Sequence, residues 1–118
     1  MRSTLLKFGK GFRVAFDVRQ IQAAEMVIAP GGHEGGPDNR HRGSDQWLFV
    51  VAGKGVAKVQ DKSGEHRDVA LEPGTLLVVE HGERHEIRND GDGLLKTLNV
   101  YYPPAFDSQG EPVGPGKD

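Results

Sequence analysis

The sequence predicts one all-β domain, a barrel of the jelly-roll type. Three observations support this fold class. The 118 residues include 17 glycines and seven prolines, which implies many tight turns between short segments. Several short runs alternate apolar and polar residues, and turn signals recur about every 8 to 12 residues, as in sandwiches and barrels. The length fits a single domain with one core.

The first strands are expected near the N-terminus. Residues 12–18 alternate Phe12, Val14, Phe16 and Val18 with less apolar residues, a period of two that predicts a half-buried strand. Residues 20–30 predict a second strand. Their Ala-Ala-Glu-Met centre also favours a short helix, but the apolar end of the segment runs directly into a glycine turn, which favours the strand.

A long loop is predicted over residues 30–45, because this segment is dense in Gly, Pro, Asp and Asn and lacks apolar periodicity. Structureless loops longer than about 12 to 15 residues are uncommon in domains and are often functional. This segment carries His33, Glu34, Arg40 and His41. The alternative is a solvated surface loop whose charges serve only solubility.

Further short strands are predicted at residues 46–51, 56–60, 66–71 and 76–79, then one around His85 and a last one at 94–102. If Gln46 points into the barrel, Leu48 and Val50 do so too, while Trp47, Phe49 and Val51 face outward. The outward side chains then need cover from an N-terminal strand or from a second subunit, or they are core within one chain. Residues 1–104 are expected to form the barrel, and residues 105–118 a tail that is a lid or a loose end.

Composition excludes several classes of partner. Fifteen Lys and Arg against 17 Asp and Glu leave a formal charge of -2, so nucleic acid and anionic membranes are not expected partners. The absence of cysteine rules out disulfides, thiolate metal ligands and a cysteine nucleophile. Residues 1–12 are too short and polar for a signal peptide or a membrane span. We therefore expect a cytoplasmic protein.

Residues 73–89 carry the most specific pattern in the chain. Gly74, Gly82, His85 and Asn89 have the spacing of the second motif of the cupin superfamily, which this sequence resembles. Glu80 stands where that motif usually has proline.

The first cupin motif is matched less completely. Gly53 fits its glycine, and His41 falls on its second histidine. Asn39 takes the place of the first histidine and Gln46 that of the glutamate.

The resemblance implies a small single-domain cupin, a double-stranded β-helix with a divalent metal on the motif residues inside the barrel, often in a homodimer. Cupins include dioxygenases, isomerases, epimerases, decarboxylases and non-catalytic binders, so the fold does not define the reaction.

On this basis the candidate metal ligands are His41, Gln46, His85 and Asn39. Imidazole suits Zn, Ni and Fe, and Mn is a further candidate ion. The two amides bring no negative charge, so we expect a divalent transition metal that is weakly bound or absent. Without metal, either histidine could instead act as an acid or base, or His85 could be a hydrogen-bonded barrel residue and His41 an exposed one.

The candidate substrate pocket consists of Arg40, Leu48, Val50 and Tyr101. An apolar floor with a few polar groups suits a small ligand, and a guanidinium suits its carboxylate or phosphate group. Pairing of Arg40 with nearby acids and simple packing of Tyr101 at a strand end are the alternatives. His33, His66 and His81 are expected at the surface, with His33 the nearest to an exception.

Three functions follow. The first is a metal-dependent enzyme, an oxygenase or isomerase that acts on a small polar or carboxylated molecule. The second is a metal-free module that binds a sugar or another small molecule without catalysis. The third is an accessory domain for dimerisation with a vestigial pocket.

Overall fold

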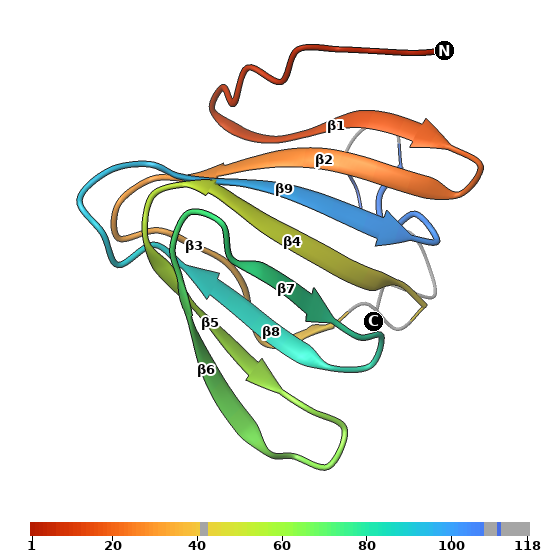
Figure 1. Ribbon diagram of the computed structural model, residues 1–118. Helices are drawn as coiled ribbons and strands as arrows, with labels where there is room; N and C mark the ends of the chain where they lie inside the picture. Colours follow the sequence, from red (N-terminus) through yellow and green to blue (C-terminus); the bar gives the residue numbers. More distant parts are fainter. Residues whose placement is uncertain (41–42, 108–110, 112–118) are drawn as a thin grey trace.

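The protein is a two-layered β-structure (Figure 1). The computed structural model describes residues 1–40, 43–107 and 111, with only the backbone for residues 36–40. This part of the chain forms nine strands: β1 (Gly11–Val18), β2 (Ile21–Ile28), β3 (His33–Arg40), β4 (Asp45–Ala52), β5 (Gly55–Gln60), β6 (His66–Leu71), β7 (Leu76–Val79), β8 (Arg84–Arg88) and β9 (Leu95–Tyr102). Across these residues there is no helix long and apolar enough to span a membrane.

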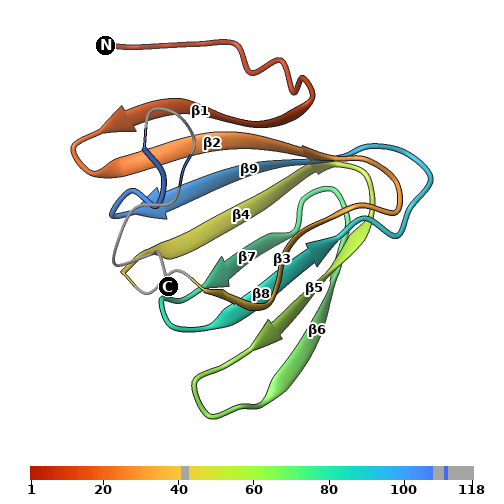
Figure 2. The ribbon, with the colours of Figure 1, turned by 180° about the vertical axis from the view of Figure 1, so that it is seen from behind.

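The strands form two antiparallel sheets that face each other (Figures 1 and 2). One sheet has the order β1-β2-β9-β4-β7, and we call it the large sheet. The other, β3-β8-β5-β6, is the small sheet. Consecutive strands β3 and β4 lie in different sheets, as do β7 and β8, which is the crossing pattern of a double-stranded β-helix. The predicted all-β fold is confirmed.

The second segment of the chain is a strand and not a helix. β2 pairs with β1 on one side and with β9 on the other, so it is an interior strand of the large sheet. Most of its side chains are buried on both faces. Tertiary pairing therefore overrides the helix propensity of its Ala-Ala-Glu-Met centre.

The prediction of a long loop over residues 30–45 is wrong, because β3 occupies half of that segment. β3 pairs with β8, with His33 opposite Arg88 and Gly35 opposite Glu86. Pairing of this kind uses backbone groups alone. β3 is also an edge strand, so it does not need the apolar side chains that identify buried strands from sequence.

The core fills the space between the sheets at the end of the barrel where the β8 to β9 loop lies. Eight buried residues form its main cluster: Met26, Ile28, Leu48, Val50, Ala57, Leu71, Ile87 and Leu95. The predicted inward direction of Leu48 and Val50 is confirmed, and both side chains are fully buried. Their apolar bulk closes this end and leaves the polar inward residues at the other.

Gly53 is required by close packing in the turn between β4 and β5. Its φ of 93° lies in the left-handed region. A Cβ atom at this position would lie 2.3 Å from the carbonyl oxygen of Leu94. Any side chain would therefore collide with backbone, which explains the glycine at this point of the first motif.

The chain that follows β9 is attached to the large sheet. The Gln22 amide, fully buried in β2, donates through Nε2 to the carbonyl oxygen of Phe106 at 2.8 Å. Its Oε1 accepts from the backbone amides of Ala105 and Phe106. The Phe106 ring packs against Phe12 and Tyr101, with centroids 4.8 and 5.2 Å away. Residues 105 and 106 thus pack with the barrel, and most of the predicted tail beyond residue 107 lies outside the described residues.

The outer side of the large sheet carries an apolar surface, which we call the outer apolar face. It consists of Trp47, Phe49, Val51, Leu76 and Val78, each at least 40% exposed. The residues pair across strands, with Trp47 opposite Val78 and Phe49 opposite Leu76. The predicted outward direction of the three β4 residues is confirmed. A continuous apolar surface of this kind is typical of an interface.

We expect a homodimer through the outer apolar face, because burying it against a second copy removes five large side chains from water. In sedimentation velocity the protein should have twice its chain mass of 12.8 kDa. Phe49→Asp places a charge at the centre of the face and should give a monomer. Leu94→Asp, at an exposed apolar residue in the turn before β9, is the matched control and should remain dimeric. A wild-type protein that sediments as a monomer contradicts the expectation.

Candidate functional site

Gln46 faces the interior of the barrel near the start of β4. Its register partners are Val79 on β7 and Tyr101 on β9. The residue is only 2% exposed. Within the described part of the chain, its Oε1 atom is buried and accepts no hydrogen bond. A buried acceptor in this state is costly, since it has lost water without gaining a donor.

His85 faces the same interior from the small sheet. It lies in β8 opposite Val59, on the same side of the sheet as the core residue Ile87, and is 4% exposed. The turn at residues 80–83 leads from Val79, the partner of Gln46, directly to the start of β8. His85 and Gln46 therefore lie at the same end of the barrel on opposing sheets.

The turn that delivers His85 is closed by its own side chains. The backbone amide of Glu80 donates to Glu83 Oε1 at 2.7 Å, and the amide of Glu83 donates to the carbonyl of Glu80. A proline could not make the first bond, because it has no N–H. Gly82 has a φ of 87°, which the turn requires. Glu80, which replaces the usual proline of the family motif, therefore makes a hydrogen bond to Glu83 that a proline could not make.

Asp45 and His81 connect the two motifs. Asp45 Oδ1 accepts from the backbone amide of His81 and lies 2.9 Å from His81 Nδ1. These bonds to the His81 backbone and side chain lower the pKa of the Asp45 carboxyl. Because Asp45 precedes Gln46 and His81 belongs to the turn before His85, the contact fixes the two strand starts relative to each other.

Asn89, the last residue of the second motif, has a structural role. Its Nδ2 donates to the carbonyl oxygens of Ile28 and Gly93, each at 2.8 Å. Its Oδ1 accepts from the backbone amide of Gly91. The bond to Ile28 holds the end of β8 against β2, and the bonds with Gly91 and Gly93 close the turn after β8, at the opposite end of β8 from the strand start that carries His85.

The remaining first-motif residues cannot be placed as ligands. His41 lies outside the described residues, and the side chains of Asn39 and Arg40 are not described. Asn39 and Arg40 belong to β3, and Arg40 pairs with Arg84 on β8. His33, His66 and His81 are exposed, as predicted. No group of three His, Cys, Asp or Glu side chains that could hold a metal ion occurs among the residues with described side chains.

Sequence reasoning missed Thr97 and Asn99, two polar residues on the inner side of β9. Both are fully buried in the row that includes Tyr101. Thr97 Oγ1 donates to Asn99 Oδ1 at 2.8 Å, and Asn99 Nδ2 donates to the Tyr101 hydroxyl at 3.2 Å. The period of two in the last strand contained the signal, because Leu95, Thr97, Asn99 and Tyr101 share one face.

Tyr101 is a buried, neutral hydroxyl group at the end of this row. Burial raises the pKa of its phenol well above the usual tyrosine value, the hydrogen bond from Asn99 lowers it, and the charge of Glu34 adds to the increase. Glu34 is exposed on β3 and pairs with Ile87, which places it on the inner side of the small sheet. One side of the barrel interior is thus lined by neutral polar groups, and the Glu34 carboxylate lies at its edge.

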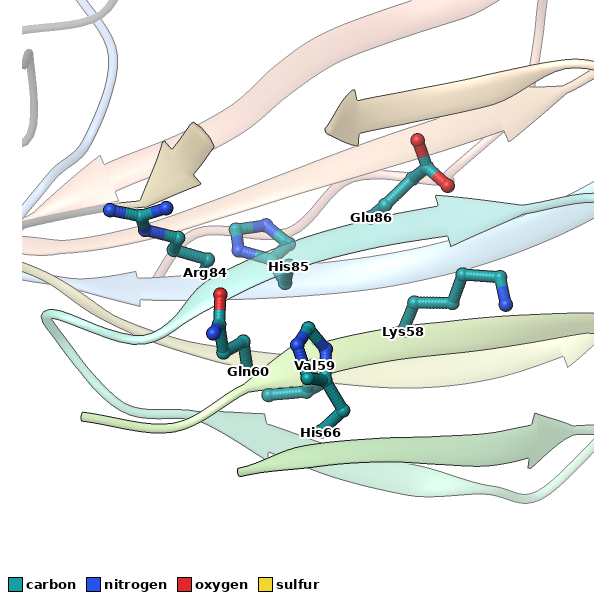
Figure 3. Close-up of a pocket in the computed structure, with 7 residues that line it drawn as sticks. All are labelled: Lys58, Val59, Gln60, His66, Arg84, His85 and Glu86. Carbon is teal, nitrogen blue, oxygen red and sulfur yellow. The ribbon is translucent and has the colours of Figure 1, made fainter. Parts of the chain in front are cut away.

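The pocket in Figure 3 belongs to the small sheet and shares His85 with the candidate site. It has a volume of about 160 Å³ and is lined by Lys58, Val59, Gln60, His66, Arg84, His85 and Glu86. Strand register places Lys58 opposite Glu86 and Gln60 opposite both Arg84 and His66, on the side of the sheet away from the core. Five of the seven lining residues therefore belong to the outer surface, while His85 and Val59 face inward.

The family of the chain is decided by residues 24–101, which match the family model described as "Cupin domain". The chain belongs to the cupin family. The matched region extends from β2 to β9 and includes both motifs.

Curated relatives match a shorter region. An acireductone dioxygenase from Bacillus cytotoxicus is 33% identical over 61 residues, which cover 52% of this chain and 36% of that protein. A second, from Bacillus anthracis, is 31% identical over the same length. This cupin therefore aligns with only about a third of these relatives.

Solved structures share the fold. A protein from Bacillus halodurans has a TM-score of 0.69 at 22% identity and covers 95% of this chain and 87% of its own. The capsular polysaccharide assembling protein CapF from Staphylococcus aureus has a TM-score of 0.72 at 22% identity, over 86% of this chain and 28% of its own. At these identities the likeness concerns the fold alone.

The Asp45 to His81 contact should contribute stability that depends on pH. Because the folded state lowers the pKa of Asp45, the contribution is present above the ordinary aspartate value of about 3.9 and is lost as pH falls through the lowered pKa. The side chains are 39% and 54% exposed, so we expect less than about 1 kcal/mol. Melting temperatures of Asp45→Ala and wild type should differ at pH 7 and converge in acid. Asp92→Ala, in an exposed turn, should show no such convergence.

Asn89→Ala should destabilise the fold, because it removes three hydrogen bonds and leaves the buried carbonyl of Ile28 without its donor. We expect a loss of about 2 to 4 kcal/mol in urea unfolding. Asp90→Ala, at the neighbouring exposed position, should change stability by less than about 0.5 kcal/mol. Equal effects of the two substitutions would contradict the structural role of Asn89.

Proposed function

We propose that this cupin binds a small polar or carboxylated molecule inside the barrel, with a divalent transition metal held by His85 and Gln46 together with His41 and Asn39. The observation that carries the proposal is that a buried imidazole and a buried carbonyl oxygen without a described donor lie on opposing sheets at the same end of the barrel. Zn, Ni, Fe and Mn are the candidate ions.

The described residues fit such an ion in their chemistry. A neutral imidazole nitrogen is a common ligand of transition metals, and an amide oxygen is a neutral ligand. An ion would also give Gln46 Oε1 the partner that it lacks among the described residues. Two ligands are fewer than the three or four protein ligands of typical sites. The remainder of the set would come from His41 and Asn39, as the motif spacing suggests.

The charge of the site argues for weak binding. Neither His85 nor Gln46 brings a negative charge, and Glu34 is exposed on the edge strand β3. A divalent ion on neutral ligands keeps its full charge in a buried place, which is costly. A ligand that carries a carboxylate would offset this charge, so ion and ligand should bind more tightly together than alone.

The curated relatives support a metal-dependent oxygenase as the enzyme class, because the two reported above are named acireductone dioxygenases. When bound, the ion would polarise a coordinated oxygen of the ligand. The chain itself would supply the rest of the environment. Leu48 and Val50 form an apolar floor that excludes water, and Tyr101 remains protonated at neutral pH because burial raises its pKa.

A metal-free binding module is the second candidate. The neutral donor set favours it, because Gln46 stands where the family motif has glutamate. Thr97, Asn99 and Tyr101 form a polar row on the inner side of β9. In a metal-free module, Gln46 and this polar row would bind the molecule through hydrogen bonds, and His85 would be one further polar contact.

Metal uptake separates the two candidates. Untagged protein is loaded with Ni, dialysed and measured for metal content and for the shift in melting temperature. We expect His85→Ala to abolish uptake, and Gln46→Glu to tighten binding about tenfold or more, because it introduces a negative charge beside the ion.

His66→Ala removes an exposed histidine and is the control, which should bind Ni as wild type does. No uptake by wild type together with none by Gln46→Glu would exclude the metal site and favour the metal-free module. Equal uptake by wild type and His85→Ala would exclude His85 as a ligand.

A further inference from the structure

The turn between β8 and β9 contains both Asp-Gly pairs of the sequence, Asp90-Gly91 and Asp92-Gly93. Both aspartates are exposed. In such a pair the glycine has no Cβ atom to shield its backbone nitrogen, so the carboxyl group of the preceding aspartate can approach that nitrogen. The two pairs are alike in local sequence, and only the contacts of the turn distinguish them.

The first pair is held by Asn89. The Gly91 amide donates to Asn89 Oδ1 at 2.9 Å. Asn89 is itself fixed, because it is 2% exposed and its backbone forms hydrogen bonds with Gly31 and Gly32. A Cβ atom at Gly91 would lie 3.3 Å from Lys54 Cβ, so this part of the turn also packs against the turn between β4 and β5. The Gly91 nitrogen is therefore both hydrogen-bonded and closely surrounded.

The second pair is open. Gly93 is exposed, and a Cβ atom built there would have no heavy atom within 4 Å. Among residues 1–40, 43–107 and 111, no group accepts a hydrogen bond from the Gly93 amide or donates one to the Asp92 carboxylate. Only the Gly93 carbonyl is held, by Asn89 Nδ2 at 2.8 Å. The Gly93 nitrogen can thus meet the Asp92 side chain without losing a hydrogen bond to a described residue.

We infer that Asp92 is a site of spontaneous isomerisation to isoaspartate, and that Asn89 protects Asp90 from the same reaction. The Gly93 nitrogen attacks Cγ of Asp92 and forms a C–N bond. The carboxyl OH leaves as water with the amide proton, which closes a five-membered succinimide ring. Water then adds to one of the two ring carbonyls. When the bond from the main-chain carbonyl carbon to nitrogen breaks, the chain continues through the side chain of residue 92.

Isomerisation at this position should disturb the barrel, because it lengthens the main chain of the turn by one carbon atom. Leu94, two residues after Asp92, packs closely against the glycine of the first motif. A Cβ atom at Gly53 would lie 2.3 Å from the Leu94 carbonyl oxygen and 2.8 Å from Leu95 Cα. Backbone packed this tightly cannot absorb an extra atom without moving. The reaction needs no bound ion or ligand, so the inference is independent of the proposed binding function.

Prolonged incubation of the full chain at neutral pH tests the inference, with a parallel sample in urea. Samples are digested with an endoprotease that cuts before aspartate but not before isoaspartate, and the peptides are quantified by mass spectrometry. In the folded protein, cleavage before Asp92 should be lost about fivefold or more faster than cleavage before Asp90, the factor that one hydrogen bond on Gly91 would impose. In urea the two positions should react at equal rates.

Asp92→Ala is the matched control, and its folded form should contain no isoaspartate in this turn. Asn89→Ala frees the Gly91 amide and should raise the rate at Asp90 to that at Asp92. Incubation continues until the urea sample contains isoaspartate at both positions. The inference is overturned if the two positions of the folded wild type react at equal rates, or if Asp92 remains unmodified at that time. This wild-type comparison decides the matter even where Asn89→Ala does not fold.

Discussion

The register of β4 between β9 and β7 determines the properties of both surfaces of the large sheet. Gln46, Leu48 and Val50 face the interior only because Gln46 pairs with Tyr101 and with Val79. A slip by one residue would exchange the two faces and place Trp47 and Phe49 inside the barrel. The polar end of the interior, its apolar floor and the outer apolar face are therefore consequences of a single pairing.

Much of this arrangement could be predicted from the sequence, because alternation of period two reports directly on a half-buried strand. It gave the inward direction of Leu48 and the outward direction of Trp47, and motif spacing gave the strand that carries His85. β3 could not be predicted in this way. An edge strand pairs through its backbone, and its glycine-rich sequence has no side-chain pattern to reveal it.

The polar row was missed for a different reason. Thr97 and Asn99 are poor core residues by type, so a search for apolar periodicity passes over them although their positions are inward. Their side chains form hydrogen bonds with each other and with Tyr101, and only the structure shows these contacts. Polar residues at inward positions of an otherwise apolar strand thus indicate a barrel interior that is lined by polar side chains. The structural role of Asn89 could not be predicted either, because its side chain forms a hydrogen bond with Ile28, which is distant in the sequence.

The Gln22 clamp on residues 105 and 106 has a consequence for how the chain folds. Its hydrogen bonds connect residues 84 positions apart, so they close one of the longest loops in the molecule. Contacts of such high sequence separation require a large loss of chain entropy before they form, and they slow folding. During synthesis β2 can pair with β1 early, but its partner β9 and the clamped segment emerge only after β3 to β8. Until then the polar end of Gln22 and one edge of β2 have no partner, so the nascent barrel cannot close before residue 106 has been synthesised.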